Sequence, residues 1–174
     1  MSLAAPSTGL LVGGHERGVP LRGRITQQNA LACIARLVVL ATEGPEVPIL
    51  MYVDSPGGSI RDSLAIISTM NGIKCPIATF CYGTAGGTAA MIFAHGTPGF
   101  RAAKVTSAFS FKGWDGVREQ DFHQSLAEVV AKDAHQQSAA VLEWLREGAE
   151  FNAQQALSNG LLDFLADEPV VPHG

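Results

Sequence analysis

The sequence is poor in the features that mark several large classes of protein. Its 174 residues contain no run of about 18 consecutive apolar residues, so no membrane-spanning helix is expected. Lys and Arg together number 12 and Asp and Glu number 16. The resulting net charge of −4 argues against a surface for nucleic acid or for an anionic membrane.

Cysteine is scarce as well. The three cysteines, Cys33, Cys75 and Cys81, lie in apolar runs, and neither a CxxC nor an HxxxH pattern is present. We therefore expect buried free thiols, as in a reducing compartment, rather than a disulfide or a metal site. No coenzyme-binding pattern is found either, so no metal and no cofactor are expected.

The chain has the length of one domain, and its 47% hydrophobic residues suffice for a sizeable core. We expect residues 1–17, which are rich in small residues, to be loose, residues 18–166 to form the domain and residues 167–174 to form an extended tail. No basic segment followed by a long apolar one opens the chain, so we expect no signal peptide and a cytoplasmic location. His15 and His173 fall in the two ends, and no function is expected of them.

Strand-like and helix-like segments alternate along the domain. Short apolar runs predict strands over 19–25, 48–54, 76–82, 100–103 and 108–112. Helical spacing predicts helices after Thr26 and Ser59 as N-caps, from Thr88 to His95, from Arg118 to Arg146 as one long helix, and from Ala153 to Ser158. This alternation predicts an α/β fold with mostly parallel strands.

Two of the strand-to-helix turns are rich in glycine. S-P-G-G-S occupies residues 55–59, and G-T-A-G-G-T occupies residues 83–88. The helix N-terminus after each turn has backbone N–H groups without an intrahelical partner. On neighbouring parallel strands these groups would lie side by side and suit an oxyanion or an enolate. The alternative is that the glycines only allow tight turns.

These motifs resemble the ClpP peptidase family. V-D-S-P-G-G-S-I-R-D-S-L-A-I-I-S-T-M resembles its signature segment, G-T-A-G-G-T-A-A-M-I-F-A-H-G its nucleophile elbow, and L-S-N-G-L-L-D its late segment, over residues 18–165. The resemblance implies the ClpP/crotonase fold, with stacked β-β-α units and a long handle helix that interlocks two seven-subunit rings. It also implies a proteolytic chamber fed by an ATP-driven AAA+ unfoldase, although the short polar N-terminus argues against unfoldase docking.

The catalytic residues of the family are not found at the matching positions. The family serine falls on Gly87, and the family histidine falls on Lys112 when S-A-F-S-F-K-G-W is aligned without a gap. The family aspartate falls on Gly148, Ala149 or Glu150, in a region shorter than the family pattern. Glycine has no nucleophile, and losing triad members costs several orders of magnitude in acyl-transfer rate.

The resemblance implies that an oxyanion hole could remain. Its donors would be the backbone N–H groups of Gly58 and Thr88, and both residues have an N–H group. The turns that support these donors contain Ser55, Pro56, Gly57 and Gly86.

Several nearby side chains leave alternatives open. Ser110 and Lys112 lie two residues apart on one strand and could form a Ser–Lys dyad. The Thr88 hydroxyl could contact a ligand, but turn and cap hydrogen bonds are the simpler role for it, for Thr84 and for Ser59. Asp54 is expected to hold its turn by an Asx-type bond rather than to act as an acid or base.

The remaining candidates are interpreted as structural. His95 suits the C-terminal end of a helix dipole, and His123 and His135 fit the face or interface of the long helix. That helix has an apolar stripe, and pairing of subunits and packing on its own sheet both explain the stripe. Asp62 is expected on a solvated helix surface. Phe111 and Trp114 are hypothesised to fill space that a substrate would otherwise occupy.

Two classes of function follow. The first is a catalytically inactive Clp subunit, resembling the triad-lacking ClpR-type members, that joins a homo- or hetero-oligomeric ring in a structural, gating or binding role. The second is acyl-group chemistry on a crotonase-like scaffold, with Lys112, Asp54 or Glu150 as the acid or base. An active but unusual serine-type peptidase acting on peptides is a further alternative.

Overall fold

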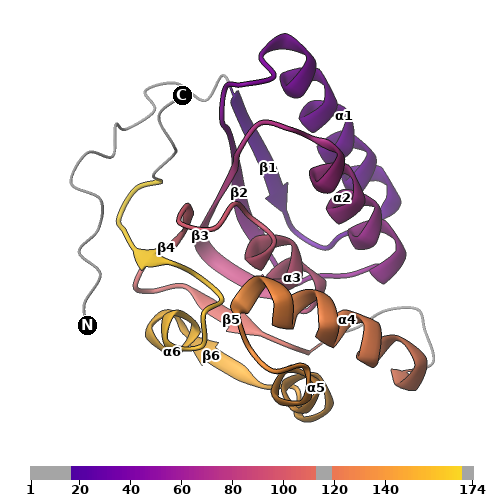
Figure 1. Cartoon of the computed structure of the whole chain (residues 1–174), viewed down its shortest axis with the longest axis vertical. Helices are drawn as coiled ribbons and strands as arrows, with labels where there is room; N and C mark the ends of the chain where they lie inside the picture. Colours follow the sequence, from indigo (N-terminus) through magenta and orange to yellow (C-terminus); the bar gives the residue numbers. More distant parts are fainter. Residues whose placement is uncertain (1–16, 113–118, 170–174) are drawn as a thin grey trace.

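The computed structural model describes residues 17–112 and 119–169, which form a single mixed sheet with helices packed mainly on one side of it (Figure 1). The strands are β1 (Gly18–Arg22), β2 (Ile49–Ser55), β3 (Ile77–Gly86), β4 (Arg101–Ala103), β5 (Ala108–Ser110), β6 (Glu150–Asn152) and β7 (Phe164–Leu165). The helices are α1 (Gln27–Glu43), α2 (Ile60–Gly72), α3 (Thr88–Ala94), α4 (Glu119–Ala134), α5 (Ser138–Glu147) and α6 (Ala153–Ser158).

The sheet is mostly parallel, as predicted. Strands pair in the order β1-β2-β3-β4-β7, all parallel. The far end of the long strand β3 pairs with β5 instead of β4, and β6 adds to β5 in antiparallel orientation. The predicted α/β fold class is therefore confirmed. Both glycine-rich turns lie at the carboxyl ends of adjacent strands, β2 and β3.

Local capping signals explain where the first two helices begin. Thr26 and Asn29 form a reciprocal capping box at the start of α1, and Ser59 Oγ accepts a hydrogen bond from Asp62 N–H at the start of α2. At the other end of α1, the Arg17 guanidinium donates to the carbonyl oxygen of Leu40 at 2.8 Å. Arg17, which the sequence placed in the loose segment, is thus tied to the domain.

The central strands are buried on both faces. Along β2, Ile49, Met51 and Val53 face the core beneath the helices, whereas Leu50 belongs to a smaller apolar cluster on the opposite face. Burial on both faces explains why the apolar run of this strand is nearly continuous. No helix in the described part of the chain is long and apolar enough to cross a membrane.

The expectation of a single helix from Arg118 to Arg146 is wrong, because helix α4 ends at Ala134 and a separate helix, α5, begins at Ser138. His135 adopts a left-handed conformation with φ 53°. Gln136 N–H donates to the Ala131 carbonyl oxygen and His135 N–H to that of Lys132, which is the hydrogen-bond pattern of a Schellman cap. Helix α5 then packs beside α4 and buries Val141 and Leu145 in the core. No continuous long handle helix is formed over the described residues.

Some expectations concern residues outside the described part of the chain. They include His15, Trp114, His173, most of the terminal segments, and the side chain of His123. Strands β6 and β7 were not predicted. Helix α6 has the predicted bounds and begins with a capping box between Asn152 and Gln155.

Candidate functional site

The two glycine-rich turns lie against each other. A β-carbon placed on Gly57 would lie 2.5 Å from the Gly86 carbonyl oxygen, and one placed on Gly86 would lie 2.8 Å from the Pro56 carbonyl oxygen. Residues with side chains would push the two backbones apart. Ser55 Oγ accepts a hydrogen bond from Gly57 N–H at 3.1 Å and closes the first turn. The predicted proximity of the two turns is confirmed.

Gly87 forms the elbow between β3 and α3. Its dihedral angles, φ 49° and ψ −122°, would strain any residue that carries a side chain. Its N–H donates to the Ser110 carbonyl oxygen at 2.7 Å, and its own carbonyl oxygen accepts from Ala90 N–H at 3.2 Å. A sharp strand-to-helix turn of this kind presents the nucleophile in α/β-hydrolases. Here the elbow is buried and carries no side chain.

The two amides expected to form the oxyanion hole are not both available. Gly58 N–H donates to Thr88 Oγ1 at 3.2 Å. Both residues are buried, and Thr88 has 0% of its surface exposed. The Thr88 hydroxyl therefore makes a hydrogen bond to a turn, which is the role favoured for it from the sequence, and the Gly58 N–H is already engaged within the protein. The buried hydroxyl accepts the hydrogen bond of one of the two donors, the Gly58 N–H.

The structure brings Lys112, at the expected histidine position, together with two of the residues considered for the aspartate position. Lys112 Nζ lies 2.9 Å from Glu150 Oε1, and the lysine stem packs over Gly148. Gly148 ends α5 in a left-handed conformation with φ 64°, and β6 begins two residues later. Both charged side chains are more than half exposed, at 56% and 66%. A surface ion pair therefore joins the residue at the histidine position to one of the three residues considered for the aspartate position.

A cleft of about 480 Å³ lies beside this ion pair. Thr84, Ser110 and Glu150 line it, together with apolar residues such as Phe151. Gly58 and Thr88 do not belong to its lining. Nor does a hydrogen bond join Ser110 to Lys112 within the described ranges, so the Ser–Lys dyad that was considered as an alternative is not assembled.

An aromatic cluster stands behind the ion pair. The ring centroids of Phe111 and Trp144 lie 5.6 Å apart, and those of Trp144 and Phe151 lie 5.2 Å apart. Phe111 is fully buried. It therefore packs in the protein core and joins β5 to α5 and β6, which differs from the hypothesis that it fills a vacated substrate site.

Asp54 performs a different structural role from the one predicted. Its Oδ1 accepts a hydrogen bond from Thr84 N–H at 3.0 Å, across to β3, rather than from its own turn. The pairing register of β2 and β3 shifts at this point, between Val53 and Ser55. Asp54 thus stabilises the bulge that leads β3 into the elbow.

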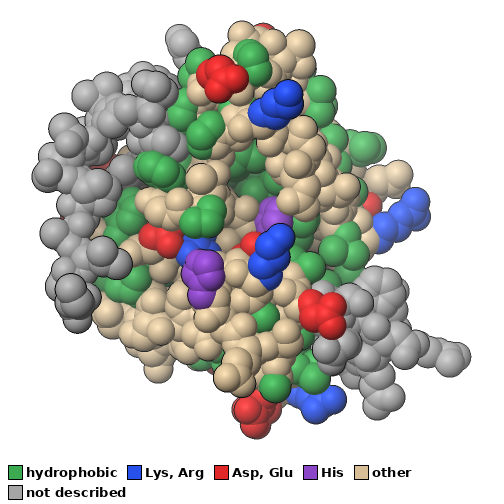
Figure 2. All heavy atoms as spheres, viewed as in Figure 1, with side chains coloured by type: hydrophobic (Ala, Val, Ile, Leu, Met, Phe, Trp, Pro, Cys, Tyr) green, Lys and Arg blue, Asp and Glu red, His purple; other side chains and the backbone are tan. Residues whose placement is uncertain are grey.

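His95 joins three helices, in agreement with a structural role. Its Nδ1 lies 2.6 Å from Asp133 Oδ2 on α4, and its Nε2 lies 3.0 Å from Asn71 Oδ1 on α2. Figure 2 shows histidine, acidic and basic side chains gathered near the middle of this face of the molecule. Both ring nitrogens of His95 are engaged, so they hold the helices in register.

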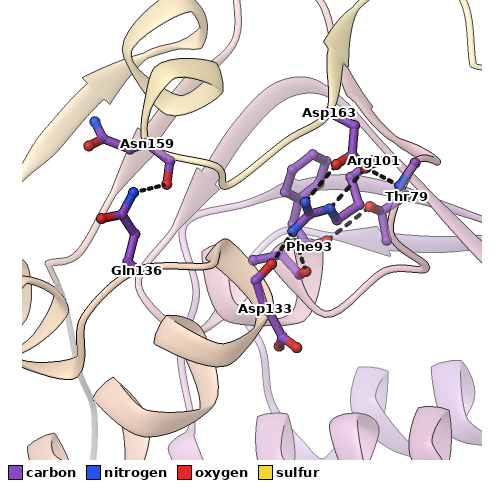
Figure 3. Close-up of polar contacts among 9 residues, drawn as sticks. Thr79, Phe93, Arg101, Asp133, Gln136, Asn159 and Asp163 are labelled. Carbon is purple, nitrogen blue, oxygen red and sulfur yellow. Dashed lines mark hydrogen bonds and ion pairs between the residues drawn. The ribbon is translucent and has the colours of Figure 1, made fainter. Parts of the chain in front are cut away.

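Sequence reasoning missed a buried ion pair between Arg101 and Asp163. Arg101 Nη2 lies 2.6 Å from Asp163 Oδ1, and Arg101 Nη1 donates to the carbonyl oxygens of Ala94 and Asp133 (Figure 3). The pair ties β4 to the ends of α3 and α4 and to the segment before β7. The sequence contains one sign of this pair: Arg101 is a lone charge within the apolar run F-R-A-A, and a buried charge needs a partner.

Two opposing effects set the pKa of Asp163. Burial alone would raise the pKa, but hydrogen bonds from the Arg101 side chain and backbone, the Arg101 charge and the Gly99 N–H hold it below its usual value. The carboxylate is therefore ionised in the folded protein at neutral pH.

The three cysteines are free and buried, as predicted. Burial raises the pKa of Cys33 to about 12 and that of Cys81 to about 11. Such thiols are poor nucleophiles at neutral pH. Over residues 17–112 and 119–169, no group of three or more metal-binding side chains comes together.

Comparison with known proteins gives consistent matches. The Clp protease family matches residues 11–112. The chain is 31% identical to the ATP-dependent Clp protease proteolytic subunit 1 of Prochlorococcus marinus over 90% of its own length and 87% of that protein. It is 32% identical to proteolytic subunit 2 of Streptomyces avermitilis over 85% of its own length and 81% of that protein.

Proposed function

Because the chain belongs to the Clp protease family, we propose that it is a subunit of a Clp-type ring that does not itself cleave peptide bonds. Members of this family form oligomeric rings. In such a ring the chain would act as a structural or regulatory subunit, beside copies of itself or beside active Clp subunits.

One observation carries the proposal: Gly87 occupies the elbow that should present the nucleophile. The elbow has the required turn geometry, with φ 49° and ψ −122°, but no hydroxyl or thiol. Acyl transfer by this family requires an atom that attacks the scissile carbonyl. Without it, only positioning and electrostatic effects remain, which is a loss of several orders of magnitude in rate.

The second catalytic position supports the same proposal. Lys112 pairs with Glu150 at 2.9 Å on the surface, in place of an imidazole held by a carboxylate. A general base must lie within hydrogen-bond reach of the group it deprotonates. Ser110, two residues away, makes no hydrogen bond to Lys112 in the part of the chain that the structure describes. This weakens the alternative of an unusual serine-type peptidase.

Acyl-group chemistry of the crotonase kind is also less well supported. It requires two amides that can both donate to a thioester carbonyl. Gly58 N–H already donates to Thr88 Oγ1. The acids and bases considered for this chemistry already have partners within the chain. Asp54 accepts a hydrogen bond from Thr84 N–H, and Lys112 and Glu150 pair with each other.

The assembly itself forms part of the proposal. The break at His135 leaves α4 with 16 residues, so interlocking of two rings by one long handle helix loses its support. The three buried free thiols are in keeping with a cytoplasmic location. Docking of an AAA+ unfoldase would have to be tested directly, by co-sedimentation of the assembled ring with the unfoldase.

The proposal is tested by adding a fluorogenic peptide and a fluorophosphonate probe to the purified protein. We expect neither turnover nor labelling. The same assays are run on the Gly87→Ser, Lys112→His double variant and on Ser110→Ala. Labelling of the wild-type protein that disappears in Ser110→Ala would refute the proposal, because the nucleophile would then have moved to Ser110.

The ring is tested separately, by co-expression with an active Clp proteolytic subunit and native mass spectrometry. We expect mixed oligomers whose peptidase activity per active subunit can be compared with that of the pure active ring. Failure to form any oligomer, alone or mixed, would contradict the subunit role.

A further inference from the structure

The Thr88 side chain occupies a position with a specific chemical meaning. Its Oγ1 accepts a hydrogen bond from Gly58 N–H at 3.2 Å, across 30 residues of sequence and from one turn to the other. A substrate carbonyl oxygen bound in an oxyanion hole would accept this same hydrogen. Thr88 is 0% exposed, so water does not compete for the contact.

The Gly58 amide cannot easily turn away from Thr88. Ile25 N–H donates to the Gly57 carbonyl oxygen at 2.9 Å, and Ser59 N–H donates to the Ile25 carbonyl oxygen at 3.0 Å. The first bond holds the peptide unit that contains Gly58 N–H, and the second holds the unit that follows it, so that Ile25 and Gly58 pair as an isolated bridge. The direction of the N–H group is therefore set by backbone that precedes the turn.

The second amide is covered as well. A β-carbon placed on Gly57 would lie only 3.0 Å from Thr88 N, so the first turn packs directly over the backbone of Thr88. Gly57, Gly58 and Thr88 are all buried. An incoming carbonyl oxygen would have to displace the hydroxyl and separate the two turns.

We propose that the Thr88 side chain itself occupies the space in front of the Gly58 and Thr88 N–H groups. The carbonyl oxygen of a peptide or a thioester therefore cannot bind there. The inference builds on the proposed function and extends it: the elbow is closed to binding in addition to lacking a nucleophile. It follows that restoring serine and histidine alone would leave the oxyanion hole blocked.

The test is amide hydrogen exchange at Gly58, followed by NMR in the full-length protein. Thr88→Val keeps the shape of the side chain but removes the hydroxyl, and Thr88→Ser keeps the hydroxyl. We expect exchange at Gly58 to accelerate by about tenfold or more in Thr88→Val, relative to the core amide of Val53, and to stay close to wild type in Thr88→Ser. Thr88→Ala supplies the same comparison if the valine variant folds poorly.

Unchanged exchange at Gly58 in both hydroxyl-free variants would overturn the inference, as would equal acceleration in Thr88→Ser. Its failure is distinguishable from failure of the proposed function. Fluorophosphonate labelling of the wild-type protein would refute the inactive subunit without altering the exchange result, whereas unchanged exchange would leave the absence of a nucleophile at Gly87 intact.

Discussion

Lys112 Nζ and Glu150 Oε1 form an ion pair of 2.9 Å; the family resemblance places the histidine on Lys112 and the aspartate on Gly148, Ala149 or Glu150. The lysine stem packs over Gly148, which ends α5, so the end of one helix supports the pair. Both side chains are more than half exposed, and pairs in such surroundings are screened by solvent. The pair therefore lies where a catalytic pair would be expected, but it is exposed to solvent, whereas a catalytic pair would be shielded from it.

We predict that the Lys112–Glu150 pair contributes little to stability. Lys112→Met and Glu150→Gln should each change the free energy of unfolding by less than about 1 kcal/mol, and the double variant should show weak coupling. Urea denaturation of the four proteins measures this. A coupling energy above about 2 kcal/mol would show instead that the pair is shielded from solvent, as in an assembled interface.

The elbow should resist any side chain. Gly87→Ala is expected to cost about 1–3 kcal/mol, because φ 49° with ψ −122° strains a residue that has a β-carbon. Gly72→Ala is the matched control, since Gly72 is an exposed helix-end residue with nothing within 4 Å of its β-carbon position. This control should be neutral or stabilising by up to about 1 kcal/mol. Equal effects of the two substitutions on thermal unfolding would contradict the strained elbow.

Features with a local cause were accessible from the sequence. Thr26 and Ser59 cap their helices through side chains within three residues, and the glycine-rich turns follow apolar strands. The approach of Gly57 to Gly86 followed from parallel pairing of neighbouring strands. The α/β class and the position of the candidate site were therefore predictable.

Features that depend on distant partners were not accessible. Strand β6 has three residues and exists because it pairs with β5. Arg101 and Asp163 are 62 residues apart. The Thr88 hydroxyl was expected to bond within a turn or cap, but no local rule reveals that its partner is the Gly58 N–H, 30 residues away. The break at His135 was missed because glycine, the usual residue in such a cap, is absent.

Loss of Asp163 should destabilise the fold. Asp163→Asn leaves Arg101, of which only 3% is exposed, without its charge partner, at a cost on the order of 3 kcal/mol near neutral pH. Asp167→Asn, on an exposed carboxylate, is the matched control and should be nearly neutral. Denaturation midpoints measure both, and equal midpoints would refute a structural role for the ion pair.

The same pair predicts how stability depends on pH. The folded-state pKa of Asp163 is lowered, so its contribution is fully present above the unfolded value of about 3.9 and is lost as pH falls through the folded value. The stability gap between wild type and Asp163→Asn should therefore be constant from pH 7 to about pH 5 and narrow below about pH 4. If the stability difference between wild type and Asp163→Asn instead increased in acid, the pKa of Asp163 would be raised in the folded protein and not lowered.

The junction of α4 and α5 should be improved by glycine. His135 is exposed and holds φ 53°, a conformation that costs a residue with a β-carbon about 1–2 kcal/mol. Part of this gain is offset by the greater freedom of glycine in the unfolded chain. His135→Gly should therefore be more stable than His135→Ala by about 0.5–1 kcal/mol, measured by urea denaturation. The alanine variant controls for loss of the imidazole. If alanine proved as stable as glycine or more so, α4 would continue through residue 135 in solution, as the unbroken apolar spacing first suggested.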